Sequence, residues 1–115
     1  MSEKYKLLIL PEAQQDLRNI IIYIAKNLAA PQAALSLQEN IEKQIKTLEF
    51  NPQRIKPIDE SPWKESGIRK TRVKNYYIYF IVDDKEMAVK ITAVIYAGRD
   101  QTTQLSERDT DKDQQ

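Results

Sequence analysis

The 115-residue sequence has no cysteine, no histidine and only two glycines, Gly67 and Gly98. Without cysteine there is no disulfide, no thiol nucleophile and no Cys/His zinc site. Without histidine there is no imidazole to move protons near neutral pH. Two isolated glycines exclude a Walker loop and a GxGxxG dinucleotide loop. The longest apolar run, residues 20–25, is far too short to cross a bilayer, so we expect no membrane-spanning segment.

What remains is an ordinary globular composition, with 41% hydrophobic and 30% charged residues. The length favours one domain, which we place at residues 1–100, because two cores would each be marginal. Residues 101–115 are polar with a single leucine, and we expect a flexible tail. The absence of cysteine is compatible with the reducing cytoplasm, where we expect the protein. The formal net charge is +1, so arguments about partners must use local clusters.

The spacing of apolar residues predicts the element order β-α-α-β-β-β. We expect a strand over 5–10, helices over about 12–28 and 31–50, a loop over 51–66 that tucks Trp63 against the domain, and strands over 68–73, 76–82 and 87–96. The apolar stripes of the helices are Ala13, Leu17, Ile20 or Ile21, Ile24 and Leu28, and then Ala34, Leu37, Ile41, Ile45 and Leu48.

These stripes must be covered, and an antiparallel sheet offers one face. We therefore expect a two-layer α+β domain in which an antiparallel helix hairpin packs on one face of a mostly antiparallel four-stranded sheet. In the last strand, Met87, Val89 and Ile91 share one parity, whereas Val94 and Tyr96 have the other. Either both faces of the sheet are partly buried, or a bulge near Thr92 shifts the register.

The most informative cluster lies over residues 69–74, where Arg69, Lys70, Arg72 and Lys74 occur without an acid. On a strand, Lys70, Arg72 and Lys74 would share a face at roughly 6.6–6.8 Å spacing. Tyrosines, including Tyr77, follow directly. Cations with aromatic rings are typical of single-stranded RNA binding. An exposed strand face that discourages edge pairing is the simpler interpretation.

Apolar residues on the first helix exceed one narrow stripe, because Ile20 and Ile22 both occur there. A wide buried face and a groove for a partner explain this equally well. The acids Asp59, Glu60 and Glu65 lie in a proline-rich stretch without metal-ligand spacing, so we expect no metal site and no cofactor.

Four segments together resemble the RelE/ParE superfamily, the toxins of type II toxin–antitoxin pairs. They are LPEAQQDLRNIIIYIA, IKTLEFNP, GIRKTRVKNYYIYFIVDD and VKITAVIYAGRD, which lie within residues 10–100. The resemblance covers roughly residues 5–100, and its fold agrees with the order of elements expected from the pattern. It implies a toxin that arrests bacterial growth, as plasmid-stabilising toxins of this kind do, and that a cognate antitoxin neutralises by wrapping it with helices or an added strand.

The resemblance implies two alternative targets. RelE-like members enter the ribosome and cut mRNA, whereas ParE-like members poison DNA gyrase and are not enzymes. By position, Lys70, Arg72 and Arg99 match basic residues that ribonuclease members use on the phosphate, and Arg69 matches a shared sheet position. We name these four, Lys74 and Tyr77 as candidate catalytic or target-binding residues, and Ile20, Ile22 and Tyr23 as candidate antitoxin contacts.

The sequence departs from the ribonuclease pattern in ways that favour the ParE-like alternative slightly. Tyr77 falls where ribonuclease members often carry arginine, Tyr96 where many have histidine, and Gly98 where a basic residue is frequent. The tyrosine or histidine that these members use near the scissile bond has no counterpart between Gln101 and Leu105. The same departures leave open a third alternative, an inactive toxin or a non-toxic binding module. The resemblance also implies that toxin and antitoxin can assemble into a hetero-oligomer.

Overall fold

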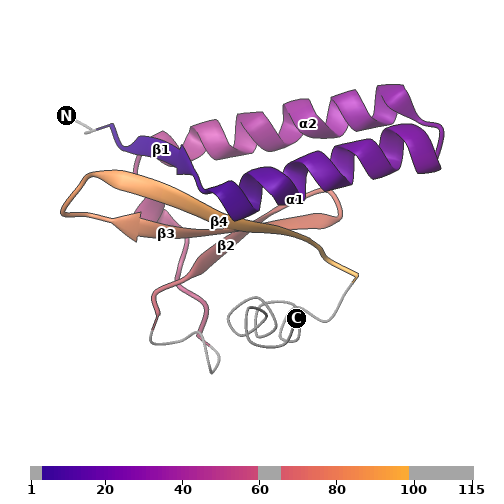
Figure 1. The fold of residues 1–115 in the computed structure, drawn as a ribbon. Coiled ribbons are helices and arrows are strands. Elements are labelled where there is room, and N and C mark those ends of the chain that lie inside the picture. The colour runs from indigo at the N-terminus through magenta and orange to yellow at the C-terminus, as the bar shows by residue number, and fades with distance from the viewer. Residues whose placement is uncertain (1–3, 60–65, 99–115) are drawn as a thin grey trace.

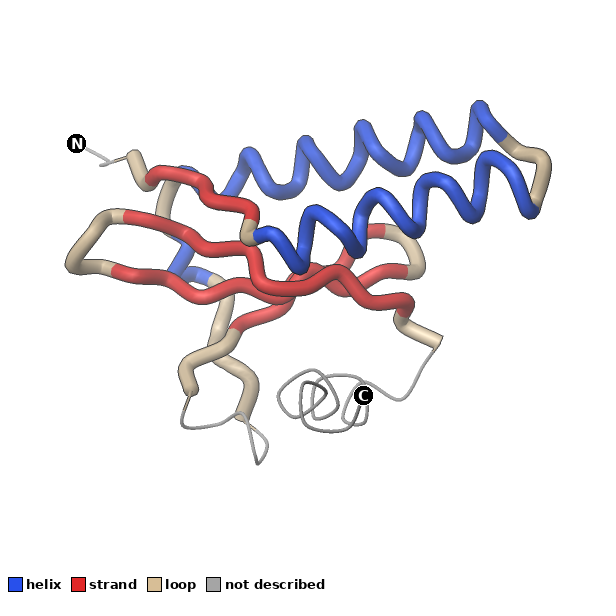
Figure 2. Tube along the Cα trace, in the orientation of Figure 1, coloured by secondary structure: helices blue, strands red, loops and turns tan. Residues whose placement is uncertain are grey.

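The computed structural model describes residues 4–59 and 66–98, and in it two helices lie side by side on one face of a four-stranded sheet (Figures 1 and 2). The expected α+β fold with a helix hairpin on a mostly antiparallel sheet is confirmed. The predictions made for Trp63, for Arg99 and for a flexible tail over 101–115 concern positions outside the described residues.

The elements follow the expected order, with short helical turns between them. They are β1 (Lys6–Ile9), α1 (Pro11–Ile22), a π-helical turn (Tyr23–Asn27), α2 (Pro31–Lys46), 3-10 turns (Thr47–Glu49 and Pro52–Arg54), β2 (Arg69–Val73), β3 (Tyr76–Asp83) and β4 (Ala88–Tyr96). Within this part of the chain no helix combines the length and apolar content that a bilayer crossing requires.

The strand order in the sheet is β1-β4-β3-β2. β1 runs parallel to β4, whereas β4, β3 and β2 are antiparallel neighbours. The first and last strands, β1 and β4, are therefore neighbours, β4 and β3 are central, and β1 and β2 form the two edges. Part of the β2 edge is covered, because Pro57 bridges to Arg69 and the Ile58 N–H donates to the Ile68 carbonyl at 2.8 Å.

Both helices begin at a proline, Pro11 and Pro31, where the missing N–H removes no helical hydrogen bond. The first helix loosens into a π-helical turn at Tyr23 and ends at Asn27. Leu28 therefore follows the helix and is 55% exposed, so its expected place in the buried stripe is wrong. The other stripe positions pack inward, including fully buried Ala13 and Ile41.

The main core fills the space between the helices and the sheet. Its buried members are Ala13, Leu37, Ile41, Ile45, Leu48, Val73, Ile78, Phe80, Val89, Ile91 and Val94. Full burial of a side chain such as Ile41 or Phe80 stabilises the fold by about 1.5–3 kcal/mol.

A β-bulge in β4 resolves the change of parity in its sequence. Tyr79 pairs with Ala93 but Phe80 pairs with Ile91, so Thr92 is the extra residue. Because of this shift, Ile91 and Val94 both face the helices despite their opposite parity. The bulge that the sequence indicated near Thr92 is confirmed.

The other interpretation, burial on both faces, is confirmed as well. A second apolar cluster of Ile58, Tyr79, Ala93 and Ile95 lies on the face away from the helices, with Ile68 and Tyr77 packed against it. The segment after the second 3-10 turn thus covers part of the sheet that the helices leave open.

Candidate functional site

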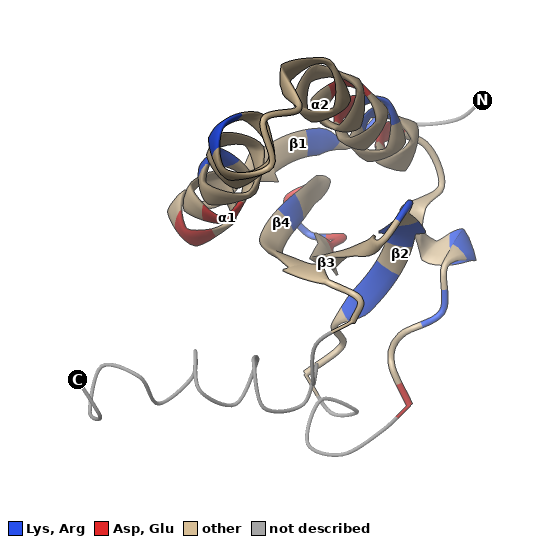
Figure 3. Cartoon of the chain, turned by 90° about the vertical axis from the view of Figure 1, so that its right-hand side faces the viewer, with Lys and Arg blue, Asp and Glu red and all other residues tan. Residues whose placement is uncertain are grey.

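The edge strand β2 presents different residues on its two faces. Thr71 and Val73 face the helices, since Val73 belongs to the main core and the Thr71 hydroxyl accepts a 2.9 Å hydrogen bond from Gln44 Nε2 of α2. Lys70 and Arg72 alternate with them and lie with Tyr77 on the opposite face. Basic positions mark much of β2, which lies below α2 in Figure 3.

Tyr77 is the centre of this basic surface. Lys70 Nζ lies 4.3 Å from the centroid of its ring, and Arg72 Cζ lies 5.5 Å from it. The Tyr79 ring meets Tyr77 edge-on, with the centroids 6.3 Å apart. A cation on an exposed aromatic ring contributes about 0.5–1 kcal/mol. Lys70, Arg72 and Tyr77 therefore form one surface, which we call the tyrosine–cation surface.

Lys74 does not continue the row of cations, and its expected place on the strand is wrong. It lies after β2, in the turn to β3, with a φ of 55° in the left-handed region. The turn reverses the chain at this point because Val73 pairs with Tyr76. Arg72 Nε donates a 2.8 Å hydrogen bond to the Lys74 carbonyl, which ties the two residues together through the backbone.

Arg69 lies apart from the tyrosine–cation surface and holds a loop. Its Nη1 donates to the Ile55 carbonyl at 2.5 Å and to the Gln53 carbonyl at 3.4 Å. Its Nε is buried without a hydrogen-bond partner among the described residues. These contacts attach the segment after α2 to the edge strand, so the structure brings Arg69 to the loop rather than to Tyr77.

The last strand ends beside the β2–β3 turn. Tyr76 pairs with Tyr96, their ring centroids are 5.5 Å apart, and the Ala97 N–H donates to the Asn75 carbonyl at 2.6 Å. Arg99 lies outside the described residues, so its expected approach to the basic strand stays a prediction.

A second candidate surface lies between the helices, away from the sheet. A hollow of about 290 Å³ is lined by Leu17, Arg18, Ile21, Ile22, Gln38, Ile41 and Glu42. We call it the hairpin groove. Its floor is apolar, and Arg18 and Glu42 supply one charge of each sign.

The three candidate antitoxin contacts lie in different settings. Ile20 packs against the main core, whereas Ile22 lines the hairpin groove and is 45% exposed. Tyr23 is 53% exposed. Ile21 in the groove and the exposed Leu28 and Leu35 were not predicted as antitoxin contacts from the sequence. The sequence did contain a signal for Ile21, because α1 carries three consecutive isoleucines. A single narrow apolar stripe cannot bury all three of them.

The tyrosine–cation surface offers cations and aromatic rings. No group of three or more carboxylate, cysteine or histidine side chains in 4–59 and 66–98 is placed to hold a metal ion. The tyrosine–cation surface can bind an anionic or aromatic partner, and the hairpin groove can bind an apolar one.

Three solved structures with a similar fold come from toxin–antitoxin systems. The similarity is to the chromosomal ParDE toxin–antitoxin system of Pseudomonas aeruginosa, at a TM-score of 0.66 and 20% identity over 81% of this chain and 96% of that one. The toxin–antitoxin complex RelBE2 of Mycobacterium tuberculosis is similar at a TM-score of 0.57 and 20% identity, over 82% of this chain and 92% of that one. The isolated Escherichia coli RelE toxin is similar at a TM-score of 0.52 and 18% identity, over 90% of this chain and 96% of that one. At these identities the likeness shows the fold.

The sequence itself identifies the family. No curated protein matches it significantly. The model of the ParE toxin of the type II toxin–antitoxin system parDE matches residues 7–101, which include both helices and all of β2, β3 and β4. The chain therefore belongs to the ParE toxin family of type II toxin–antitoxin systems.

Proposed function

We propose that this toxin arrests growth by inhibiting DNA gyrase and that a cognate antitoxin neutralises it by covering the helix hairpin. The observation that supports gyrase over mRNA is the position of Tyr77. A ring, rather than a guanidinium, occupies the middle of the basic surface, and Lys70 and Arg72 both lie against it.

The chemistry of RNA cleavage explains why this observation favours gyrase. Cleavage needs a base for the 2′-hydroxyl, a cation beside the phosphorane and an acid for the leaving oxygen. The chain has no histidine to act as acid or base. Arginine and tyrosine are instead enriched where proteins bind other proteins. A protein target therefore suits the tyrosine–cation surface better than catalysis does.

The hairpin groove suits an amphipathic helix of the antitoxin. Such a helix lays apolar residues into a groove at positions i, i+3 and i+4. Ile21 and Ile22 supply apolar surface there, and Arg18 and Glu42 can fix the direction of a charged helix. The solved structures with this fold include a toxin–antitoxin complex, which supports an antitoxin partner.

Ribosome-dependent mRNA cleavage is the second candidate, and the same surface favours it in one respect. Lys70 and Arg72 can contact phosphates while the neighbouring tyrosines stack on bases. Arg99 would have to supply a further cation.

Expression of the toxin alone and with its antitoxin, encoded by the adjacent reading frame, tests the proposal. We expect growth arrest only without the antitoxin, accompanied by gyrase–DNA cleavage complexes. Primer extension on a translated transcript should show no codon-positioned cuts. Such cuts without gyrase complexes would establish the second candidate instead, and normal growth at a verified protein level would indicate a non-toxic binding module.

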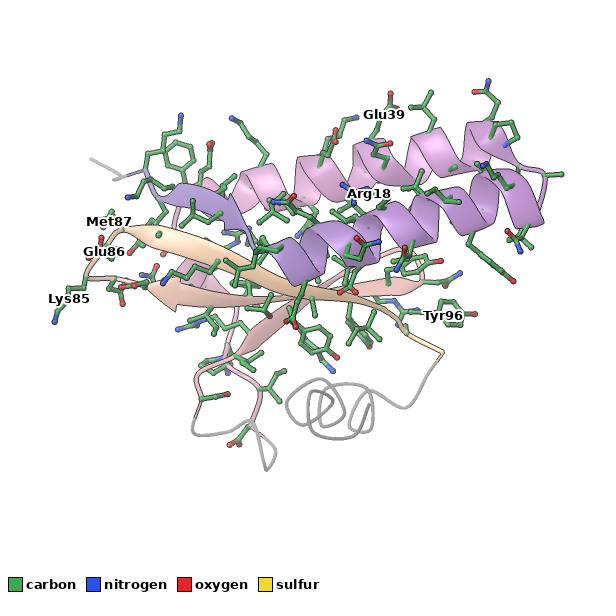
Figure 4. The ribbon with its side chains drawn as sticks, in the orientation of Figure 1. Arg18, Glu39, Lys85, Glu86, Met87 and Tyr96 are labelled. Carbon is green, nitrogen blue, oxygen red and sulfur yellow. The ribbon has the colours of Figure 1, made fainter. Side chains whose placement is uncertain are left out.

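Variants of Tyr77 separate the surface from the rest of the fold. Tyr77→Leu removes the ring and should raise the toxin concentration needed for gyrase inhibition about tenfold, whereas Tyr77→Phe keeps the ring and most of the effect. Lys85→Gln is the control, because Lys85 lies in the turn at the far end of β3 (Figure 4).

A further inference from the structure

A polar hollow lies between α2 and the β2–β3 turn, apart from the hairpin groove, and it shares Arg72 with the tyrosine–cation surface. Its volume is about 380 Å³, and it is lined by Asn40, Lys43, Gln44, Thr47, Arg72, Val73 and Lys74. We propose that this hollow is a binding site for phosphate groups. The proposal does not depend on which target the toxin inhibits.

The charge of the lining favours an anion. Lys43, Arg72 and Lys74 contribute three positive charges, and no acid lines the hollow. None of these three side chains forms a salt bridge with a carboxylate of the described residues. Nearby Lys46 does form one, with its Nζ 3.2 Å from Glu49 Oε2. Glu39, one helical turn before Lys43, projects from α2 away from the sheet (Figure 4). The negative end of the α2 dipole amounts to about half a charge, which three cations outweigh.

The donors are held in place before any ligand arrives. Arg72 Nε donates to the Lys74 carbonyl at 2.8 Å, which holds this lining residue in place with its guanidinium carbon 5.5 Å from the centroid of the Tyr77 ring. Gln44 Nε2 joins α2 to Thr71 of β2 at 2.9 Å, so the width of the hollow is fixed by the core elements. Preorganised donors lose less entropy on binding.

The shape and the donor types indicate phosphate. Asn40, Lys43, Gln44 and Thr47 have the spacing i, i+3, i+4 and i+7, so they form a stripe about 10 Å long on one side of the helix. Arg72 offers the planar donor pair that matches phosphate oxygens. A stripe of this length accommodates two linked phosphates, which a nucleic-acid strand or a free polyphosphate would supply.

Lys74 supports this assignment through its backbone. Its φ of 55° lies in a region that glycine and asparagine adopt with less strain. The fold therefore tolerates an unfavourable conformation for a residue whose charge borders the hollow. It also means that Lys74→Gly and Lys74→Asn remove the charge without adding backbone strain.

Amide chemical shifts of the full-length protein, followed during titration at constant ionic strength, test the proposal. The probes are sodium pyrophosphate, a single-stranded thymidine oligonucleotide and a glutamate peptide of equal charge. We expect saturable shifts at Lys43, Gln44 and Lys74 with the two phosphate probes. Lys43→Gln and Lys74→Asn should each weaken phosphate binding about tenfold, and the matched control Lys85→Gln should leave it unchanged.

The two sources of phosphate differ in their dependence on salt. A strand should bind more tightly than pyrophosphate, with a slope of log K against log salt of about −0.7 per phosphate. Equal binding of both probes would assign the hollow to a free phosphate compound. The proposal is overturned if no saturable shift occurs at the lining residues, if the Lys43 and Lys74 variants bind as the control does, or if the glutamate peptide binds equally well.

Thermal unfolding of each variant shows whether weaker phosphate binding comes from the site or from loss of folded protein. Lys74→Asn should unfold at or above the temperature of the parent, because the strain at φ 55° is relieved. Weaker phosphate binding by a variant of unchanged stability then reports on the site itself.

Discussion

The carboxylate of Asp16, in α1, accepts a 2.9 Å hydrogen bond from the backbone N–H of Val94, in the central strand β4. The two residues are 78 positions apart in the chain. The contact joins the helix layer to the sheet just after the bulge at Thr92, where the irregular pairing alters the strand's own hydrogen bonding.

Replacing Asp16 by alanine should therefore destabilise the protein. The part-buried Val94 N–H would lose this acceptor, and an unsatisfied buried donor costs about 1–3 kcal/mol. Urea unfolding measures the loss. Glu12→Ala, which removes an exposed acid from the same helix, is the control and should change stability by less than half as much.

Deleting Thr92 should remove the bulge and leave every other side chain of β4 on its present face. Without the extra residue, Ile91 and Ala93 become consecutive and pair regularly with Phe80 and Tyr79, so Val94 still faces the main core and Ile95 the opposite face. Thr92→Val removes a 3.3 Å hydrogen bond to the Tyr79 carbonyl, and this loss should cost about 0.5–1.5 kcal/mol.

Circular dichroism and urea unfolding distinguish the two Thr92 variants. Both variants should unfold cooperatively, Thr92→Val with a lower midpoint than the parent. Loss of cooperative unfolding in the deletion variant would contradict the assignment of Thr92 as the extra residue of the bulge.

Asp83 should make stability depend on pH in the acid range. The Glu86 N–H donates to its carboxylate at 3.1 Å and Lys90 lies 3.5 Å away, and these contacts lower the pKa of Asp83 below 3.8. A lowered pKa in the folded state means that the charged form stabilises the fold above the unfolded pKa. This contribution is lost as the pH falls through the folded pKa.

The comparison of the parent with Asp83→Asn at pH 7 and at pH 2.5 tests this prediction. The parent should be the more stable at pH 7, and the difference should shrink at pH 2.5. Glu86→Gln is the control, because it removes an acid from the same turn (Figure 4) and keeps the backbone donor. A difference that is equal at both pH values would contradict the role of the charge.

A charge in the hairpin groove should prevent neutralisation without unfolding the toxin. Ile22→Asp places a carboxylate on an apolar lining residue that is 45% exposed, so the antitoxin should bind at least tenfold more weakly while the toxin's own stability changes little. Calorimetric titration with the antitoxin measures the effect. The buried Ile41 is unsuitable for such a test, because its replacement would unfold the core.

Leu35→Asp is the matched control, since Leu35 is 50% exposed on α2 and does not line the groove. Equal loss of antitoxin binding in both variants would indicate a broader contact than the groove.

Local periodicity was sufficient to predict the helix hairpin and the strands, because helical and strand spacings differ, and the main-core position of Ile41 followed from the pattern. The interrupted alternation in β4 left two explanations open, and the observed pairing was needed to place Val94 in the main core. The resemblance of several segments to the RelE/ParE superfamily was equally readable, and the family match confirms it.

The arrangement of the basic residues was decided by the tertiary structure. Strand alternation predicts that Lys70, Arg72 and Lys74 share a face, but it does not reveal where the strand ends, and Lys74 falls in the turn. Nor does a sequence show that Arg69 binds the carbonyl of Ile55, because that loop is placed by contacts distant along the chain. Spacing fixes which residues share an element, whereas the packing of elements fixes which side chains meet.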